Sequence, residues 1–172
     1  MLVRASLIGE DRVVKTSLDV EIREEIERPV ADVWAMISDA TLLPRWLGEF
    51  EHVAQESAGP VGRGSVFRYT LTPGPGERSA LLEWVDWQPQ RRAAWDGPPL
   101  RSFLGGARPR GSFELTPLGP ARTLFISRYK PELSGVLVFT RPVVARWLKK
   151  QRTADTQRLK RILEADQRMP TP

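Results

Sequence analysis

The chain has 172 residues, of which 41% are hydrophobic and 27% charged, a composition that fits one globular domain with its own core. It contains no cysteine, which excludes a disulfide framework, a thiolate metal site and a cysteine nucleophile. The net charge is +5, but the basic residues are distributed along the chain among 21 acidic ones. We therefore expect no nucleic-acid partner, because nucleic-acid-binding domains gather their basic residues on one face or tail.

The first residues do not have the pattern of an export signal. The opening sequence MLVRASLIGEDR lacks a continuous apolar segment, and no apolar run approaches the roughly 18 residues of a membrane span. We expect a cytoplasmic protein with one domain over residues 13–166. Residues 1–12 are expected to form an arm or an extra edge strand, and residues 167–172 a disordered tail.

The first predicted strand occupies residues 13–26, where apolar and polar residues alternate. Its apolar side chains share one face: Leu18, Val20, Ile22 and Ile26. Glu24 is the exception, because its position places a carboxylate on the apolar face. Two interpretations stay open: a carboxylate near the strand end that pairs with an arginine or reaches water, or a carboxylate inside a cavity.

Two short helices are predicted after this strand, forming a V-shaped element. Pro29 opens the first, whose apolar residues follow the i, i+3, i+4, i+7 spacing of a buried helix face: Val30, Val33, Trp34 and Ile37. Thr41 is expected to cap the second helix, TLLPRWL, which ends near Gly48.

The middle of the chain has the pattern of antiparallel hairpins. Turn residues recur between short strands, which are predicted over residues 53–57, 65–72, 78–88, 92–96, 112–117 and 123–129. The segment 97–110, GPPLRSFLGGARPR, is rich in Gly, Pro and Arg, and we interpret it as a mobile loop.

A long amphipathic helix is predicted over residues 136–165, with Pro142 in its first turn. Gln151 interrupts its apolar stripe, which consists of Phe139, Val143, Trp147, Leu148, Ala154, Leu159, Ile162 and Leu163. We interpret the basic residues of its other faces, including Arg152, as solvent-exposed. One long helix with many strands favours an α+β fold in which a curved antiparallel sheet wraps around the helix.

Six segments in this order carry a family resemblance: IERPVADVWAMISD, LLPRWL, VGRGSVFRY, WQPQRRAAW, FELTPLGPARTLFISRY and LKRILEA. Over residues 17–165 the chain resembles the START-like (SRPBCC) superfamily, in its polyketide cyclase/dehydrase-like branch. The resemblance implies the helix-grip fold: a curved seven-stranded antiparallel sheet around a long C-terminal helix, with two short helices after the first strand. It also implies a hydrophobic cavity between sheet and helix, with the segment 97–110 at its mouth. Members bind lipids, sterols, quinones, polyketides or plant hormones, and no catalytic residue is common to all of them.

Ten residues are candidates for the wall of such a cavity: Glu24, Phe67, Tyr69, Glu83, Trp84, Trp87, Trp95, Arg128, Tyr129 and Trp147. Phe67 and Tyr69 share the more apolar face of their strand and are expected to point inward. The strands that carry Glu83, Arg128 and Tyr129 have two mixed faces, so strand alternation leaves the orientation of these side chains open.

Two charged pairs that involve members of this set are conceivable. A Glu24–Arg128 or a Glu83–Arg68 pair would orient a ligand or act as an acid/base couple. The alternative is a cross-strand salt bridge on the solvent face.

The tryptophans also allow two interpretations. Trp84, Trp87 and Trp95 line a cavity or belong to an ordinary core, whereas Trp34 and Trp147 occupy helix positions expected to pack in the core. His52 is the single histidine, interpreted as a surface or loop residue, so we expect neither a metal site nor a cofactor.

Three functional hypotheses follow. The first is binding of a small hydrophobic or aromatic ligand, lipid-, isoprenoid- or polyketide-like, in the cavity. The second is a cyclase-, aromatase- or dehydratase-type enzyme that uses a pocket Arg, Tyr or Glu. The third is a membrane-surface or protein-interaction module that uses the basic terminal helix, with weak contact with an anionic membrane. The sequence leaves open whether the protein is a monomer or a homodimer.

Overall fold

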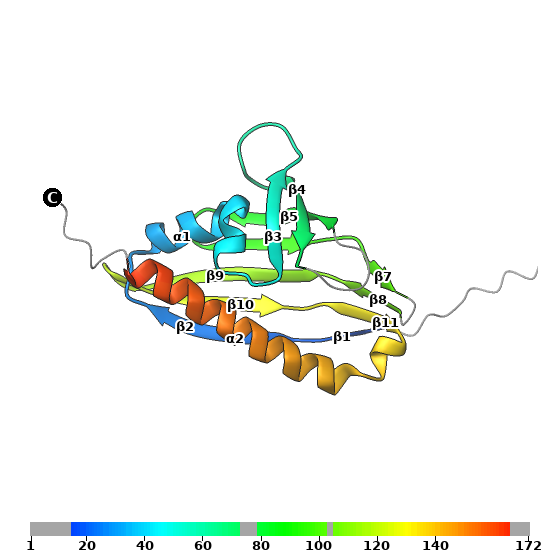
Figure 1. Cartoon of the computed structure of the whole chain (residues 1–172). Coiled ribbons are helices and arrows are strands. Elements are labelled where there is room, and N and C mark those ends of the chain that lie inside the picture. Colours follow the sequence, from blue (N-terminus) through cyan, green and yellow to red (C-terminus); the bar gives the residue numbers. More distant parts are fainter. Residues whose placement is uncertain (1–14, 73–78, 103–104, 166–172) are drawn as a thin grey trace, which may run out of the picture.

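A computed structural model describes residues 15–72, 79–102 and 105–165, and Figure 1 shows their arrangement. The strands are β1 (Lys15–Ser17), β2 (Val20–Ile26), β3 (Phe50–Gln55), β4 (Val66–Leu71), β5 (Ser79–Gln88), β6 (Arg92–Asp96), β7 (Leu100–Ser102), β8 (Gly105–Arg108), β9 (Arg110–Gly119), β10 (Arg122–Tyr129) and β11 (Glu132–Gly135). The helices are α1 (Val30–Ser38), the 3-10 helices η1 (Ala40–Arg45) and η2 (Val136–Val138), and α2 (Arg141–Ala165). Residues 1–12 and 167–172 lie outside the described ranges, so their predicted roles stay predictions.

Seven antiparallel strands form the main sheet, in the order β2-β10-β9-β6-β5-β4-β3. The helix α2 lies across one face of this sheet, over β2, and α1 packs on the same side against β9 and β10 (Figure 1). This arrangement confirms the predicted α+β helix-grip architecture. A second sheet of four short strands, in the order β1-β11-β8-β7, lies beside the N-terminal end of α2.

The main core fills the space between the seven-stranded sheet and the helices. Its most completely buried large side chains include Ile26, Ile37, Trp46, Phe125 and Leu159. A second, smaller cluster joins β2, β11 and the segment between β1 and β2 to the N-terminal half of α2, through Leu18, Val20, Ile22, Leu133 and Leu148. The burial of the apolar face of β2 confirms the alternation predicted for this segment.

Three predicted boundaries are wrong. The first strand is interrupted at Leu18 and Asp19, so that β1 and β2 belong to different sheets. The last helix begins only at Arg141, because Gly135, with φ 67°, turns the chain and residues 136–138 form the separate η2. Asp39 rather than Thr41 caps η1, and its carboxylate accepts hydrogen bonds from the Thr41 N–H (2.9 Å) and hydroxyl (2.6 Å). No helix within the described ranges is both long and apolar enough to cross a membrane.

The segment 97–110 contains two strands instead of the predicted loop. Its second strand, β8, pairs with β11, which the sequence analysis did not predict. Gly106 donates its N–H to the Ser134 hydroxyl (3.1 Å), which in turn donates to the Gly106 carbonyl (3.2 Å). The short sequences GGAR and ELSG lack the alternation and the β-branched residues typical of strands, so tertiary pairing determines their conformation.

Gly111 provides a test of the packing inside the sheet. It lies in β9 between Trp95 of β6 and Tyr129 of β10. A Cβ atom there would collide with the Trp95 indole ring and lie 2.6 Å from the Arg128 carbonyl oxygen. We expect Gly111→Ala to lower the free energy of unfolding by about 2 kcal/mol, as measured by urea denaturation.

The matched control is Gly119→Ala in the same strand, where an added Cβ meets no atom within 4 Å. This variant should unfold at nearly the same urea concentration as the parent protein. Equal destabilisation by both substitutions would contradict the assigned position of the Trp95 ring over Gly111.

Candidate functional site

A cavity of about 230 Å³ lies between the main sheet, η1 and α2. Its wall is mostly aliphatic and aromatic, and includes Leu43, Leu47, Phe50, Val53, Phe67, Leu71, Leu82, Trp84, Trp95, Leu100, Phe113, Leu133, Val144 and Leu148. The polar side chains of the wall are Glu49, Tyr69, Glu83, Ser127, Tyr129 and Arg152. Such a space excludes water from apolar surface while offering a few polar contacts.

Aromatic rings form a continuous part of this wall. Each ring approaches the next edge-on or tilted: Phe67 to Trp84 at 6.3 Å between ring centroids, Trp84 to Trp95 at 6.2 Å, and Trp95 to Tyr129 at 6.5 Å. The first three stand on the adjacent strands β4, β5 and β6, and Tyr129 reaches Trp95 across Gly111 of β9. Trp84 and Trp95 are directly opposite each other on β5 and β6. A wall of this kind offers flat ring faces and polarised ring edges to a planar ligand.

A buried ionic cluster completes the wall on the side of α2. The Arg152 side chain, only 5% exposed, forms ion pairs with Glu49 and, at 3.2 Å, with Asp155. Its guanidinium also lies over the Tyr129 ring, 4.8 Å from the ring centroid. Asp155 accepts a hydrogen bond from the Gly48 N–H at 3.1 Å. These contacts tie α2 to the chain between η1 and β3, and to β10.

Burial and charge set the protonation of this cluster. Burial alone would lower the pKa of the Arg152 guanidinium, but the charges around it, Glu49 first, outweigh this effect and raise the pKa. Burial, together with the charge of Glu49, raises the pKa of the Tyr129 phenol well above its usual range. Burial likewise raises the pKa of Asp155. At neutral pH the cavity therefore presents a fixed cation and a neutral phenol.

Two residues of the wall carry an unsatisfied hydrogen-bond donor. The indole Nε1 of Trp84 and the Nε of Arg152 are buried and have no hydrogen-bond partner among the described residues. A buried donor without a partner costs free energy, and an acceptor atom that came within hydrogen-bond distance would remove that cost.

The structure brings seven of the ten candidate residues to the cavity wall: Phe67, Tyr69, Glu83, Trp84, Trp95, Tyr129 and Trp147. Phe67 and Tyr69 are buried, whereas Glu83 and Trp147 are exposed and lie at the edge of the cavity. The core packing expected for Trp147 is wrong, because its side chain is 58% exposed.

Glu24 and Trp87 do not line this cavity. Glu24 pairs with Lys160 of α2 at 2.9 Å, so a lysine takes the place of the arginine or water expected for a strand-end carboxylate. Trp87 packs against Trp34 of α1, with 5.0 Å between ring centroids. A β-bulge in β5 between Trp84 and Asp86 shifts the register, so Trp84 and Trp87 come together at 5.6 Å despite their odd spacing.

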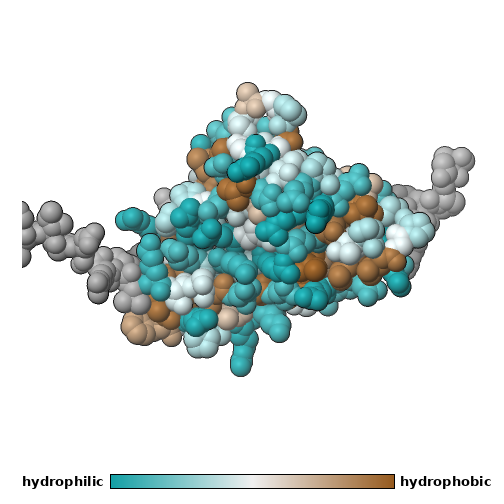
Figure 2. All heavy atoms as spheres, turned by 180° about the vertical axis from the view of Figure 1, so that it is seen from behind, coloured by the Kyte–Doolittle hydropathy of each residue, from teal (hydrophilic) through white to brown (hydrophobic). Residues whose placement is uncertain are grey.

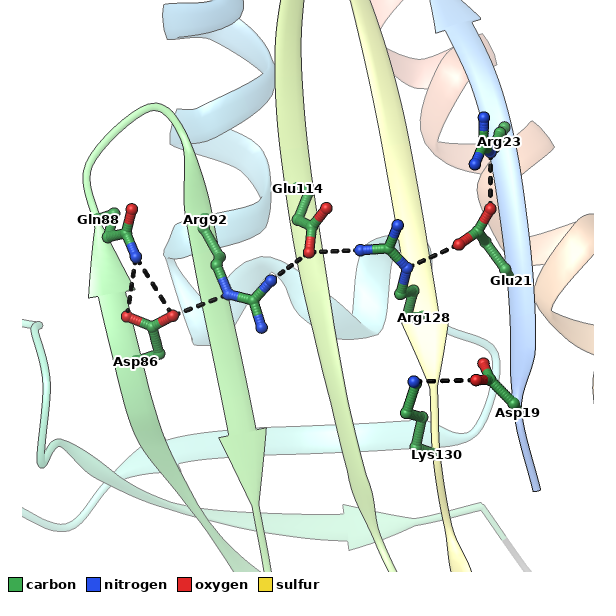
Figure 3. Close-up of polar contacts among 9 residues, drawn as sticks. All are labelled: Asp19, Glu21, Arg23, Asp86, Gln88, Arg92, Glu114, Arg128 and Lys130. Atoms are coloured by element: carbon green, nitrogen blue, oxygen red, sulfur yellow. Dashed lines mark hydrogen bonds and ion pairs between the residues drawn. The ribbon is translucent and has the colours of Figure 1, made fainter. Parts of the chain in front are cut away.

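Arg128 also lies away from the cavity, on the opposite face of the main sheet. There it joins a row of cross-strand contacts that runs from β5 to β2 through Asp86, Arg92, Glu114, Arg128, Glu21 and Arg23 (Figure 3). Arg128 contacts Glu21 at 2.6 Å and Glu114 at 2.5 Å. Viewed from behind, this side of the molecule is largely hydrophilic (Figure 2).

Neither of the two predicted charged pairs is formed. Glu24 pairs with Lys160, and Arg68 pairs with Glu56 at 2.7 Å on the surface. The alternative interpretation, cross-strand salt bridges on the solvent face, fits Arg128. In the parts of the chain that the structure describes, no group of three His, Cys, Asp or Glu side chains is placed to hold a metal ion.

Arg152 and Glu49 are the site residues that the sequence analysis missed. Arg152 was expected in solvent, but it lies four residues after Leu148 and seven before Leu159, on the buried stripe of α2. This spacing was a usable signal, because positions i+4 and i+11 of a helix share a face.

Comparison with known proteins places this geometry in context. Residues 17–164 match the family model described as polyketide cyclase/dehydrase and lipid transport. A comparison with curated proteins found no match.

Solved structures of similar fold include a conserved protein from Geobacillus kaustophilus, at 17% identity and a TM-score of 0.69, covering 86% of this chain and 96% of that chain. An aromatase/cyclase from a Streptomyces species has 16% identity and a TM-score of 0.66, with 89% and 97% of the two chains covered. Truncated norcoclaurine synthase from Thalictrum flavum has 15% identity and a TM-score of 0.65, with coverage of 89% and 97%. At these identities the likeness shows the fold alone.

The raised phenol pKa of Tyr129 predicts how stability changes in alkaline solution. The folded state favours the neutral phenol, whereas tyrosines of the unfolded chain ionise at about pH 10. Stability is therefore lost as the pH rises above that value. Between about pH 10 and 11, we expect the parent protein to lose about 1 kcal/mol more of its unfolding free energy than Tyr129→Phe, which cannot ionise.

Urea denaturation of both proteins across this pH range measures the difference, and groups common to both proteins cancel in the comparison. Parallel loss of stability in the two proteins would show that the Tyr129 phenol ionises as freely as in the unfolded chain.

Proposed function

The chain belongs to the polyketide cyclase/dehydrase and lipid transport family, and we propose that it binds a compact, largely apolar ligand that contains at least one ring. The binding site is the cavity between the main sheet and α2. The observation that carries this proposal is the aromatic wall of Phe67, Trp84 and Trp95 around an otherwise aliphatic space. Burial of apolar ligand surface supplies the affinity.

The size and shape of the cavity limit the ligand. Its volume of about 230 Å³ lies below the range of roughly 300 to 1,000 Å³ that is usual for drug-sized molecules. A fused pair of rings suits it better than a complete phospholipid. The tilted rings of the wall favour a planar ligand over a branched one.

The polar part of the wall favours a neutral acceptor atom on the ligand. The Trp84 Nε1 and the Arg152 Nε each lack a partner among the described residues. A ligand oxygen that displaces the atoms covering one of them and comes within hydrogen-bond distance would satisfy a buried donor. Arg152 already contacts the carboxylates of Glu49 and Asp155. A carboxylate on the ligand would be repelled by these two groups, so a ketone or phenol oxygen is favoured.

Catalysis of a cyclisation is the second candidate, and the meeting of Arg152, Tyr129 and Glu49 at the cavity wall favours it. In such a reaction the guanidinium would stabilise negative charge developing on a carbonyl oxygen. The neutral Tyr129 phenol would donate a hydrogen bond to the same oxygen, and a carboxylate would accept a proton from the neighbouring carbon, leaving an enolate. The cavity would hold the substrate bent and away from water.

Native mass spectrometry of freshly purified protein, with a solvent extract of the same sample, tests the binding proposal directly. We expect a retained small molecule whose mass and ring chemistry fit the cavity. A protein that arrives empty and binds none of a panel of bicyclic ketones and phenols would overturn the proposal. Conversion of such a compound into a cyclised or dehydrated product would establish the enzymatic alternative instead.

The role of the Trp84 donor can be tested with 1-tetralone, a neutral bicyclic ketone, as the probe. Trp84→Phe keeps an aromatic ring but removes the N–H, and we expect the dissociation constant to rise about fivefold, which corresponds to one hydrogen bond of about 1 kcal/mol. Isothermal titration calorimetry measures this change.

Trp87→Phe is the matched control, since Trp87 lies on the same strand but outside the cavity wall. Its affinity for 1-tetralone should remain that of the parent protein. An equal loss in both variants would show that Trp84 acts through packing rather than through its donor.

A further inference from the structure

Four large apolar side chains are exposed on η2 and the beginning of α2, and we name them the apolar ridge: Val136, Phe139, Val143 and Trp147. Their exposed fractions are 53%, 81%, 70% and 58%, higher than those of Val85 (39%) and Leu118 (38%), the other exposed large hydrophobic residues described. Exposed apolar residues scattered singly are ordinary, but a group gathered at one end of the molecule indicates an interaction site.

The part of the ridge that lies on α2 is on a different side of the helix from the residues that pack on the sheet. Val143 and Trp147 are four residues apart and lie on the same side of the helix. The buried residues Leu148 and Arg152 lie on another side, toward the core. Packing of α2 on the described part of the chain therefore does not explain the ridge. Figure 2 shows hydrophobic atoms at the lower left, the end of the molecule where η2 and the first turns of α2 lie in Figure 1.

Exposed cations flank the ridge: Arg141, Arg146, Lys149 and Lys150. None of them forms an ion pair with another described residue. The three on α2 nearest to Trp147 line one groove along the helix. Residues 133–154 contain no aspartate or glutamate, so this segment carries an excess of positive charge. An apolar strip beside unpaired cations is complementary to an anionic lipid surface.

We propose that this end of the molecule docks on an anionic phospholipid bilayer, with the apolar ridge inserted among the head groups and the flanking cations on lipid phosphates. Tryptophan and phenylalanine favour this interfacial depth, and lysine and arginine reach the phosphates from it. A second copy of the chain is the poorer partner, because a symmetric contact through the ridge would bring the two sets of unpaired cations together.

Trp147 connects this surface to the cavity. It is 58% exposed and belongs to the ridge, yet it also forms part of the cavity wall beside Val144 and Leu148. Docking through the ridge would therefore place the edge of the cavity against the lipid surface. An apolar ligand could then move between bilayer and cavity without passing through water. This consequence rests on the proposed function, whereas the docking itself does not.

Vesicle flotation tests the docking, with phosphatidylcholine vesicles that contain or lack phosphatidylglycerol. We expect binding to the anionic vesicles only, with the bound fraction falling severalfold when the salt is raised from roughly 0.1 M to roughly 1 M, because the Debye length shrinks from about 10 Å to about 3 Å. Equal binding to both vesicle types, or binding unaffected by salt, would overturn the proposal.

Two pairs of variants separate the contributions of the ridge and of the cations. Phe139→Ser with Val143→Ser should reduce the partition coefficient at least about tenfold, given the apolar surface removed. Val85→Ser with Leu118→Ser alters exposed apolar residues elsewhere and should leave it unchanged. Arg146→Gln with Lys150→Gln should also weaken binding, whereas Arg63→Gln with Arg91→Gln, both exposed and distant, should not.

Equal losses of vesicle binding in a variant and its control would contradict the assigned surface. A parent protein that is a dimer, and that the Phe139→Ser with Val143→Ser variant converts to a monomer, would contradict it as well. Thermal unfolding of each variant verifies that it is folded. The assay contains no cavity ligand, so a failure of the binding proposal leaves its result untouched. Trp84→Phe should lose affinity for 1-tetralone and still bind anionic vesicles.

Discussion

The position of α2 depends on the buried contact of Arg152 with Glu49 and Asp155. The first turns of this helix bury few apolar side chains. Hydrophobic packing therefore holds the C-terminal half of α2 against the sheet more firmly than the N-terminal half. A buried cation between two carboxylates tolerates little displacement, because each charge left unpaired would cost several kcal/mol of desolvation, on the order of 3 to 5 kcal/mol. The cluster therefore defines where the helix meets β3 and β10, and with it one wall of the cavity.

The same cluster determines the chemistry of the cavity. Tyr129 lies beneath the guanidinium, and its burial keeps the phenol neutral. Arg152 retains its charge because Glu49 and Asp155 compensate for the loss of water. An otherwise apolar space thus contains a fixed cation and a neutral phenol on the side of α2, and these two groups can orient a ligand.

The features that the sequence predicted and those that it did not differ in their physical origin. The alternation in β2 and the spacing in α1 are local patterns set by one buried face, and both were readable. The bulge after Trp84 exchanges the two faces of β5, so strand alternation could not predict which side chains of β5 point inward. The strands of the second sheet depend on partners distant in the sequence, so local patterns could not predict them either. Arg152 was missed for another reason. A charged residue on a helix is usually exposed, and this one is buried because the fold brings its partner, Glu49, to it.

The pairing of β2 with β10 has a consequence for how the chain folds. Strands β3 to β6, β9 and β10 follow one another as neighbours and can pair as they are made, but β2 forms its ladder only with residues 123–129, about a hundred positions later. During synthesis, β2 therefore has no strand to pair with in this sheet until β10 has left the ribosome. Loop closure over this distance adds an entropic cost to the docking of β2, and the edge of β10 is open to wrong partners until β2 has docked.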